Sequence, residues 1–312
     1  MGDIGGTNAR FAWQACANAP LTDTAAYLCN EHDGLQTAIR RYLSAHGEGA
    51  PRGCAIANPI TGDTVRMINH HWSFSISGLQ RELDIECLTV INDFTALALS
   101  LPELTAADLR QVGPGKAAPG GARAVIGPGT GLGVSGLLPA ASGALAPISG
   151  VGGHVTLPAG DEREAAVLQC LRQRYGHVSA ERALSGPGLV NLYDAACLLA
   201  GQAPSALEPA AVIARARSGS EPACVTALEL FCGFLGSVAG DLALTLGARG
   251  GGYIGGGIAP RLISEIERSS FREPFECKGR FRDFLAAIPT FVIDASLSPA
   301  LIGAARALEV AA

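Results

Sequence analysis

The chain has 312 residues, of which 48% are hydrophobic and 16% are charged, a balance that suits large buried cores and excludes an intrinsically disordered protein. Its formal net charge of −5 argues against nucleic acid or an anionic membrane as a partner bound through a general basic surface. Since domains commonly hold ~100–200 residues, we expect two lobes with a cleft between them.

The cysteines and the most apolar tract indicate the cellular compartment of the protein. The nine cysteines form no CxxC pair and no cluster with histidine at zinc spacing, so we expect buried free thiols, a reducing cytoplasm and no zinc. No basic-then-apolar signal peptide opens the sequence. The tract from Ala227 to Gly247 carries Glu229 and Asp241, so its uncharged run is shorter than the ~20 residues of a membrane span and predicts a buried helix.

The first part of the chain alternates strands with helical patterns, which is typical of a mixed α/β layer. An amphipathic helix is predicted over 35–46. Short β-branched or apolar runs predict strands over 9–16, 24–30, 53–60, 64–69 and 86–92. Glycine, proline and alanine then dominate residues 112–124, which indicates a loop, and we place a change of lobe near residue 104.

The second part begins with a predicted strand, glycine turn and strand over 124–138. Longer helical tracts are predicted over 161–248, followed by a strand, glycine turn and helix over 251–266. A last strand over 290–295 and a last helix over 299–310 end the chain. The segments near residues 3 and 126 share a glycine turn, a threonine and a following strand, which would fit a duplicated unit.

The segment DIGGTNAR, from Asp3 to Arg10, is the first candidate for a phosphate-binding turn. Glycines permit a positive φ and remove side chains that would keep a phosphate away, so successive N–H groups can point at one anion. Asp3 could hold Mg²⁺ through water, because that ion keeps much of its hydration shell. The alternative is an ordinary glycine hairpin.

Two further glycine turns favour a phosphate site. GPGTGLG is not a Walker loop, because no Gly-Lys-Ser/Thr follows, and it opens a strand where a dinucleotide fingerprint would open a helix. GGYIGGGIAP could let a flat base or ribose lie against backbone ahead of a helix. Two strand-flanked glycine turns with threonine are what binding a nucleotide phosphate tail from two sides requires, and the three turns together favour a phosphate site.

Asn92 and Asp93 stand where a predicted strand ends and a helix begins. In one interpretation an Asx residue merely caps the helix. In the other, Asp93 lies at the carboxyl end of a strand, where ligands of α/β sheets usually bind, and accepts the proton of an attacking hydroxyl.

His154, after two glycines, and Glu181, at a short helical start, are weaker candidates. Single residues of these types are usually structural. A capping box between Glu181 and Ser179 is a further alternative, although the two-residue gap fits it poorly.

Taken together, the sequence resembles the bacterial glucokinases, hexokinase-type sugar kinases of the actin-like ATPase superfamily. The resemblance runs nearly end to end and rests on the strings GDIGGTNARFA, AIANPITGD, INDFTALALSLPEL, GTGLGVS, GGHV, GHVSAERALSGPGLVNLY, GGYIGGGIAPR and FREPFECKGRF. It implies a two-domain α/β fold of the actin-like ATPase (ribonuclease H-like) type, with an interdomain cleft.

The resemblance also implies an activity and roles for residues. Such enzymes transfer the γ-phosphoryl group of MgATP to the 6-hydroxyl of glucose, the entry step of glycolysis. Asp93 would be the general base, and Asn92, His154 and Glu181 would bind sugar hydroxyls. Asp3 would serve the metal and nucleotide, and the glycine turns would contribute the other ATP contacts: Gly2, Gly5, Gly6, Thr7, Gly129, Thr130, Gly131 and Gly256.

The implied organisation is a small domain of residues 1–103 plus 295–312, completed by the C-terminal helix, and a large domain of residues 104–294. A homodimer is implied as well. A second hypothesis is a glucokinase-like protein with weak or altered activity that binds glucose, a related hexose or a nucleotide as a regulator.

Two departures from the family pattern bear on function. Val151 stands where the family has a glutamate that binds sugar hydroxyls. An apolar side chain cannot accept those hydrogen bonds, and we expect their absence to cost ~1.5–3 kcal/mol of binding free energy, or roughly 10–150-fold in sugar affinity. The phosphate motif starts at Gly2, whereas the family has several more apolar residues before it. A first strand of about three residues offers a short ladder, so either residues precede it or the turn is held by the following strand alone.

Overall fold

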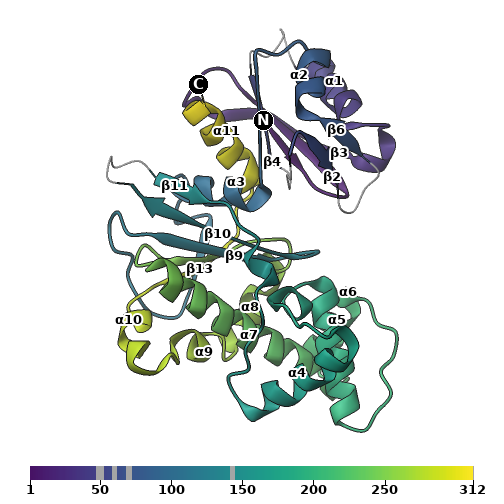
Figure 1. The fold of residues 1–312 in the computed structure, drawn as a ribbon, viewed down its shortest axis with the longest axis vertical. Coiled ribbons are helices and arrows are strands. Elements are labelled where there is room, and N and C mark those ends of the chain that lie inside the picture. The colour runs from purple at the N-terminus through teal and green to yellow at the C-terminus, as the bar shows by residue number, and fades with distance from the viewer. Residues whose placement is uncertain (47–52, 58–61, 68–71, 141–144, 312) are drawn as a thin grey trace. The chain divides into compact units, whose positions relative to one another are not determined.

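The computed structural model describes residues 1–46, 53–57, 62–67, 72–140 and 145–311 (Figure 1). It divides into two compact units. Unit 1 comprises Met1–Thr105 and Ala295–Ala312, and unit 2 comprises Ala106–Asp294. Parts of the predicted strands over 53–60 and 64–69 lie outside the described residues.

Unit 1 is built on a five-stranded sheet in the order β3-β2-β1-β4-β7. Its strands are β1 (Gly2–Ile4), β2 (Asn8–Gln14), β3 (Leu21–Leu28), β4 (Gly53–Ala57) and β7 (Cys87–Ile91). β5 (Thr64–Arg66) pairs with β6 (Ser73–Ser75) in a separate two-stranded sheet. Its helices are α1 (Leu35–His46), α2 (Ile76–Glu82), α3 (Asp93–Ser100) and α11 (Pro299–Ala311). β1, β4 and β7 run parallel, so their carboxyl ends share one edge of the sheet.

The short strand β1 is paired on both sides. Gly2 faces Phe11 of antiparallel β2 and Ile56 of parallel β4. The hypothesis that the following strand alone holds the glycine turn is therefore wrong.

At the start of β1 lies a largely apolar cavity of about 510 Å³, lined by residues of β2, α1 and β4 among others.

The C-terminal helix α11 packs on α3 and on β4 in unit 1, as Figure 1 shows. Gly303 makes this close approach possible, because a Cβ there would lie 1.7 Å from the carbonyl oxygen of Ala96. The last residues of the chain thus complete the unit formed by the first hundred.

The sheet of unit 2 repeats the five-strand topology of unit 1 and adds one antiparallel strand, β8. Its strands lie in the order β11-β10-β9-β12-β13-β8. They are β8 (Leu109–Val112), β9 (Arg123–Pro128), β10 (Leu132–Pro139), β11 (Leu145–Ile148), β12 (Gly252–Ile254) and β13 (Thr290–Ile293). In both units three antiparallel strands are followed by two parallel ones, which confirms the repeat suggested by the two similar strand-turn-strand segments.

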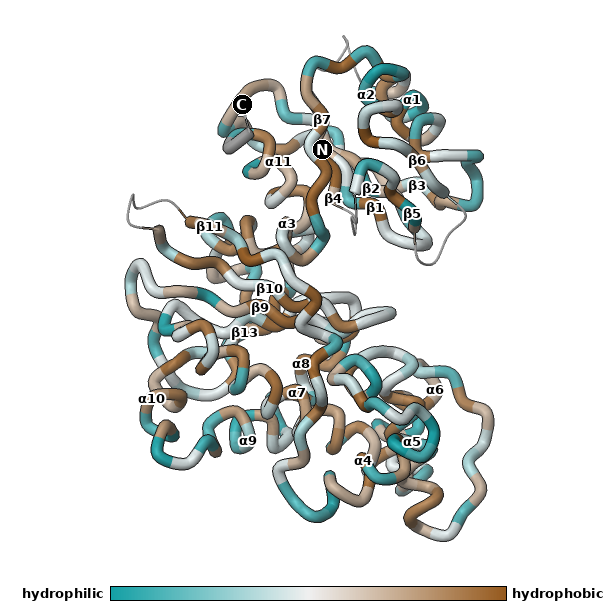
Figure 2. The backbone as a smooth tube through the Cα atoms, viewed as in Figure 1, coloured by the Kyte–Doolittle hydropathy of each residue, from teal (hydrophilic) through white to brown (hydrophobic). Residues whose placement is uncertain are grey.

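The helices of unit 2 surround one long apolar helix, α7 (Pro222–Leu246). The others are α4 (Glu162–Tyr175), α5 (Gly186–Leu199), α6 (Pro209–Ser218), α8 (Ile263–Arg268), α9 (Arg272–Glu276) and α10 (Arg282–Ala286). Figure 2 shows the hydrophobic residues along α7, the one helix in the described ranges that is long and apolar enough to span a membrane. Since 78% of its most apolar window is buried, the predicted core helix is confirmed.

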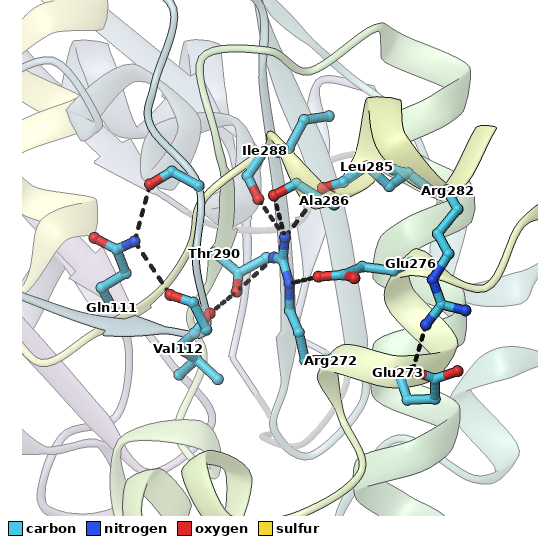
Figure 3. Close-up of polar contacts among 12 residues, drawn as sticks. Gln111, Val112, Arg272, Glu273, Glu276, Arg282, Leu285, Ala286, Ile288 and Thr290 are labelled. Carbon is cyan, nitrogen blue, oxygen red and sulfur yellow. Dashed lines mark hydrogen bonds and ion pairs between the residues drawn. The ribbon is translucent and has the colours of Figure 1, made fainter.

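A partly buried arginine joins three segments of unit 2. Arg272 of α9, with a side chain only 14% exposed, pairs with Glu276 at 2.5 Å. Its guanidinium also donates to the backbone carbonyls of Leu285, Ala286 and Ile288, as Figure 3 shows. One side chain thereby joins α9 to α10 and to the segment that leads into β13.

The cysteines are all free thiols, but they are not all buried. Four of them are buried, and Cys54, Cys87 and Cys170 are only partly buried. The expectation of buried thiols is wrong at Cys16 and Cys277, which are exposed. Both follow regular elements, β2 and α9, and stand in the loops after them.

Candidate active site

The first glycine turn, Gly5–Thr7, joins β1 to β2 in unit 1. The Gly5 N–H donates to the carbonyl oxygen of Asn8 at 2.9 Å, and the Thr7 carbonyl accepts from the N–H of Cys29 at 2.9 Å. Neither Gly5 nor Gly6 has a positive φ, so this turn does not use the left-handed backbone that glycine permits. A Cβ on Gly5 would meet only ordinary contacts, the nearest at 3.5 Å. The turn itself therefore tolerates a side chain there, and a glycine leaves that space to a ligand.

Asp3 and Gly2 lie in β1, before this turn. Gly2 is buried inside the sheet between Phe11 and Ile56, a position that offers no surface to a nucleotide. The carboxylate of Asp3 is 14% exposed and contacts Arg10 Nη1 at 3.3 Å and Ser298 Oγ at 2.7 Å. Ser298 comes from the C-terminal segment of unit 1, a partner for Asp3 that sequence reasoning missed because the two are far apart in the chain.

Asn92 has the helix-capping role considered above and keeps a free group as well. Its Oδ1 accepts from the N–H groups of Phe94 at 2.9 Å and Thr95 at 3.1 Å. Within the described ranges its side-chain Nδ2 has no hydrogen bond, and this amide remains available as a donor. Capping and ligand binding are therefore compatible in one residue.

Asp93 occupies the first position of α3, at the carboxyl end of β7. One carboxylate oxygen accepts from the Phe94 N–H at 3.1 Å. Burial raises the pKa of Asp93 above its usual value, the Phe94 N–H opposes this, and the negative charge of Asp3 adds to it. A partly buried carboxylate of raised pKa at a sheet edge is suited to accept a proton.

In unit 2 the second and third glycine turns lie against each other. The turn of residues 129–131 joins β9 to β10, and residues 255–257 follow β12, the parallel neighbour of β9. The N–H of Gly255 donates to Ile126 at 2.8 Å, and that of Ile258 donates to Pro128 at 3.1 Å. Two segments more than a hundred residues apart thus form one backbone surface at the carboxyl edge of the sheet.

Glycine occupies the positions on this surface for different reasons. Gly256 has a φ of +78°, and a Cβ there would lie 2.5 Å from the carbonyl oxygen of Pro128, so the fold itself requires glycine. A Cβ on Gly129 would meet nothing closer than 3.9 Å, and one on Gly257 would meet nothing within 4 Å. Gly257 belongs to the third glycine turn that the sequence analysis proposed for the nucleotide, and Thr130, within the second turn, is exposed.

His154 ends a short 3-10 helix, Gly152–His154, that packs on β10. A Cβ on Gly153 would lie 2.0 Å from the Leu132 carbonyl oxygen, so this helix and the start of β10 are in direct contact. The exposed ring of His154 has no hydrogen bond within the described ranges. Val151, which precedes the helix, is 77% exposed, a large exposed fraction for an apolar side chain.

Glu181 points at the second glycine turn. Its Oε2 accepts from the N–H of Leu132 at 2.9 Å. Ser179 makes no side-chain cap hydrogen bond, so the capping-box alternative is wrong. A β-bridge between Thr156 and Ser179 holds the segments of His154 and Glu181 side by side.

The candidate residues therefore gather in two places, one in each unit. Unit 1 brings Asp3, Asn92, Asp93 and the turn of residues 5–7 to one edge of its sheet. Unit 2 brings the second and third glycine turns together with His154 and Glu181. The described residues contain no group of three or more His, Cys, Asp or Glu side chains that could hold a metal ion by themselves.

Comparison of the sequence with known proteins gives matches along the whole chain. A family model described as Glucokinase matches residues 1–311. A glucokinase of Aromatoleum aromaticum is 56% identical over 312 residues, covering 99% of this chain and 94% of the relative. A glucokinase of Chromobacterium violaceum is 49% identical, covering 99% and 88%.

Solved structures agree with these matches. The crystal structure of a glucokinase from an Antarctic psychrotroph has a TM-score of 0.89 and 36% identity, covering 99% of this chain and 98% of that one. A ROK family glucokinase from Streptomyces griseus, solved with glucose and AMPPNP, has a TM-score of 0.62 and 19% identity, covering 98% and 97%. The latter shows a shared fold, that of the actin-like ATPases.

Proposed function

The chain belongs to the glucokinase family, and on this premise we propose that it is an enzyme that transfers the γ-phosphoryl group of ATP to the 6-hydroxyl of glucose. The relatives named above are glucokinases, and the match to this chain covers 94% and 88% of their length. They give no support to the alternative of a regulator. The observation in this chain that carries the proposal is the environment of Asp93.

Asp93 would act as the general base. It stands at the carboxyl end of a parallel strand, and its raised pKa favours accepting the proton of the sugar hydroxyl as that oxygen attacks phosphorus. The Phe94 N–H holds the carboxylate in place. Proton acceptance and positioning are the main demands that phosphoryl transfer makes on a side chain of this kind.

The sugar would be bound by donors and acceptors that the fold leaves free. The Nδ2 of Asn92 can donate to a hydroxyl while Oδ1 caps α3. The ring of His154 can donate or accept, and the carboxylate of Glu181 has one oxygen, Oε1, with no hydrogen bond in the described ranges. Each of these groups can exchange a hydrogen bond with a hydroxyl of a sugar.

The nucleotide would lie on glycine-rich backbone. The open spaces at Gly5, Gly129 and Gly257 allow a phosphate or ribose to approach the main chain closely. This role extends to Gly6, Thr7 and Thr130 by the family resemblance. Buried Gly2 instead contributes to the sheet and Gly256 to the turn, and the space beside Gly131 is taken by the Glu181 carboxylate.

Mg²⁺ fits the donors around Asp3. This ion is usually held by one or two carboxylates together with substrate phosphates, and it keeps several waters. The carboxylate of Asp3 already contacts Arg10 and Ser298, which favours a contact through water. When bound, the ion would neutralise phosphate charge.

The proposal is tested by measuring ADP formation with glucose, mannose, fructose and N-acetylglucosamine. We expect turnover that depends on sugar and is fastest with glucose. Val151→Glu, which restores the family's acceptor, should lower the KM for glucose by about 10-fold or more. Val155→Glu is the matched control, because Val155 is also exposed, at 54%, on the same segment. Glucose-independent ADP formation, or none in any variant, would refute the assignment.

We further propose that the enzyme is a cytoplasmic homodimer that feeds glucose into glycolysis and has no nucleic-acid or membrane partner. The nine free thiols and the negative net charge support this setting. The dimer rests on the family resemblance.

A further inference from the structure

The second glycine turn holds a carboxylate in a space that only glycine leaves open. Glu181 Oε2 lies 2.9 Å from the N–H of Leu132, the residue directly after Gly131. A Cβ added to Gly131 would lie 2.5 Å from that same oxygen and 3.4 Å from the carboxyl carbon. No side chain can occupy this position while Glu181 stays where it is.

Backbone conformation does not explain the glycine at position 131. Its φ lies outside the left-handed region, so an L-residue could adopt the same backbone. The nearest atoms to its absent Cβ belong to the Glu181 carboxylate. Gly129, two residues earlier in the same turn, differs, since a Cβ there meets nothing closer than 3.9 Å.

The backbone on both sides of this contact is fixed. The carbonyl oxygen of Gly129 accepts from the N–H of Gly186, which ties the turn to the segment after Glu181. The carbonyl oxygen of Glu181 accepts from Ser185 Oγ at 2.8 Å, and Ser185 in turn caps α5. The carboxylate is therefore anchored at its backbone and at Oε2, which leaves Oε1 as the oxygen available to a ligand.

We propose that Gly131 is a positioning residue for the sugar. By having no side chain it lets the Leu132 N–H hold Oε2 of Glu181, and this fixes the direction in which Oε1 meets a sugar hydroxyl. The inference rests on the proposed function, because it takes Glu181 as a sugar ligand. The two glycines of this turn therefore have different roles. Gly131 positions the sugar ligand Glu181, and Gly129 leaves room for the nucleotide.

The test is a double-mutant cycle read by calorimetric glucose binding without nucleotide and by the KM values for both substrates. Gly131→Ala should raise the Kd and KM for glucose at least 10-fold and change the KM for ATP less than 2-fold. In a Glu181→Ala background, Gly131→Ala should change glucose affinity less than 2-fold, because the displaced group is gone. Gly129→Ala is the matched control and should raise the KM for ATP while sparing glucose binding.

Three outcomes would overturn the inference: an equal loss of glucose affinity in both backgrounds, a rise in the KM for ATP in place of glucose, or unchanged glucose affinity in Glu181→Ala alone. If Gly131→Ala fails to fold, folding of the double variant supports the contact, and its failure too refutes it. Glucose turnover by the unsubstituted chain tests the kinase assignment separately. If that assignment is wrong, the unsubstituted chain itself shows no turnover of glucose, whatever the variants do.

Discussion

Asp93 combines three influences on one carboxyl group at the start of α3. Burial and the charge of Asp3 raise its pKa, while the Phe94 N–H lowers it. A base must be deprotonated to accept a proton, so activity is present above the pKa and is lost as the pH falls through it. The raised pKa therefore places the acidic limb of the kcat/KM profile above the ordinary aspartate value near ~3.9.

Asp3→Asn should move this limb to lower pH, because it removes a negative charge that disfavours ionised Asp93. The rate itself will also fall if Asp3 serves the metal, so the readout is the midpoint of the limb. Glu82→Gln makes the same charge change at an exposed ion pair with Arg40 in unit 1 and should leave the midpoint unchanged. An unmoved or raised midpoint in Asp3→Asn would contradict the electrostatic account.

At the scale of elements, the packing of α9 against α10 and the segment before β13 depends on one partly buried arginine. Arg272 of α9 satisfies a carboxylate and three carbonyl groups that belong to different segments, and its guanidinium also lies 4.6 Å from the ring of Phe275. Removing one partner of such a pair leaves a buried charge and several carbonyls without donors.

Arg272→Met should destabilise the protein by about 3 kcal/mol, which corresponds to a fall of roughly 10 °C in the thermal unfolding of a unit of this size. Arg282→Met is the matched control, since Arg282 pairs with Glu273 on the surface, at side-chain exposures of 47% and 62%. Its expected cost is below ~1 kcal/mol. Equal shifts in differential scanning calorimetry would show that burial of Arg272 has no special role.

For the molecule as a whole, the two sheets share the arrangement of five strands, to which unit 2 adds β8, and each presents its candidate residues at the carboxyl edge of its parallel strands. Much of this organisation could be predicted, because strand and helix periodicity, glycine turns and an Asn-Asp step are local signals. The helix predicted over 35–46 is observed as α1, and the similarity of the two strand-turn-strand segments is confirmed in the two sheets.

Contacts between distant residues could not be predicted in the same way. No local pattern shows that Ser298 contacts Asp3, that Glu181 reaches Leu132, or that β4 supports β1. The sequence also does not show why a position carries glycine. Neighbouring atoms leave no room for a Cβ at Gly131 and Gly256, whereas a Cβ would fit at Gly129. Each of these facts depends on where the chain returns in space.

The most direct test of the account is glucose phosphorylation by Asp93→Asn, which keeps the shape of the side chain but removes the base. We predict a loss of at least ~100-fold in kcat, with nucleotide affinity, measured by calorimetry, within 2-fold of the unsubstituted chain. Turnover above a few per cent of the original rate would contradict the assignment of Asp93 as the base that receives the sugar proton.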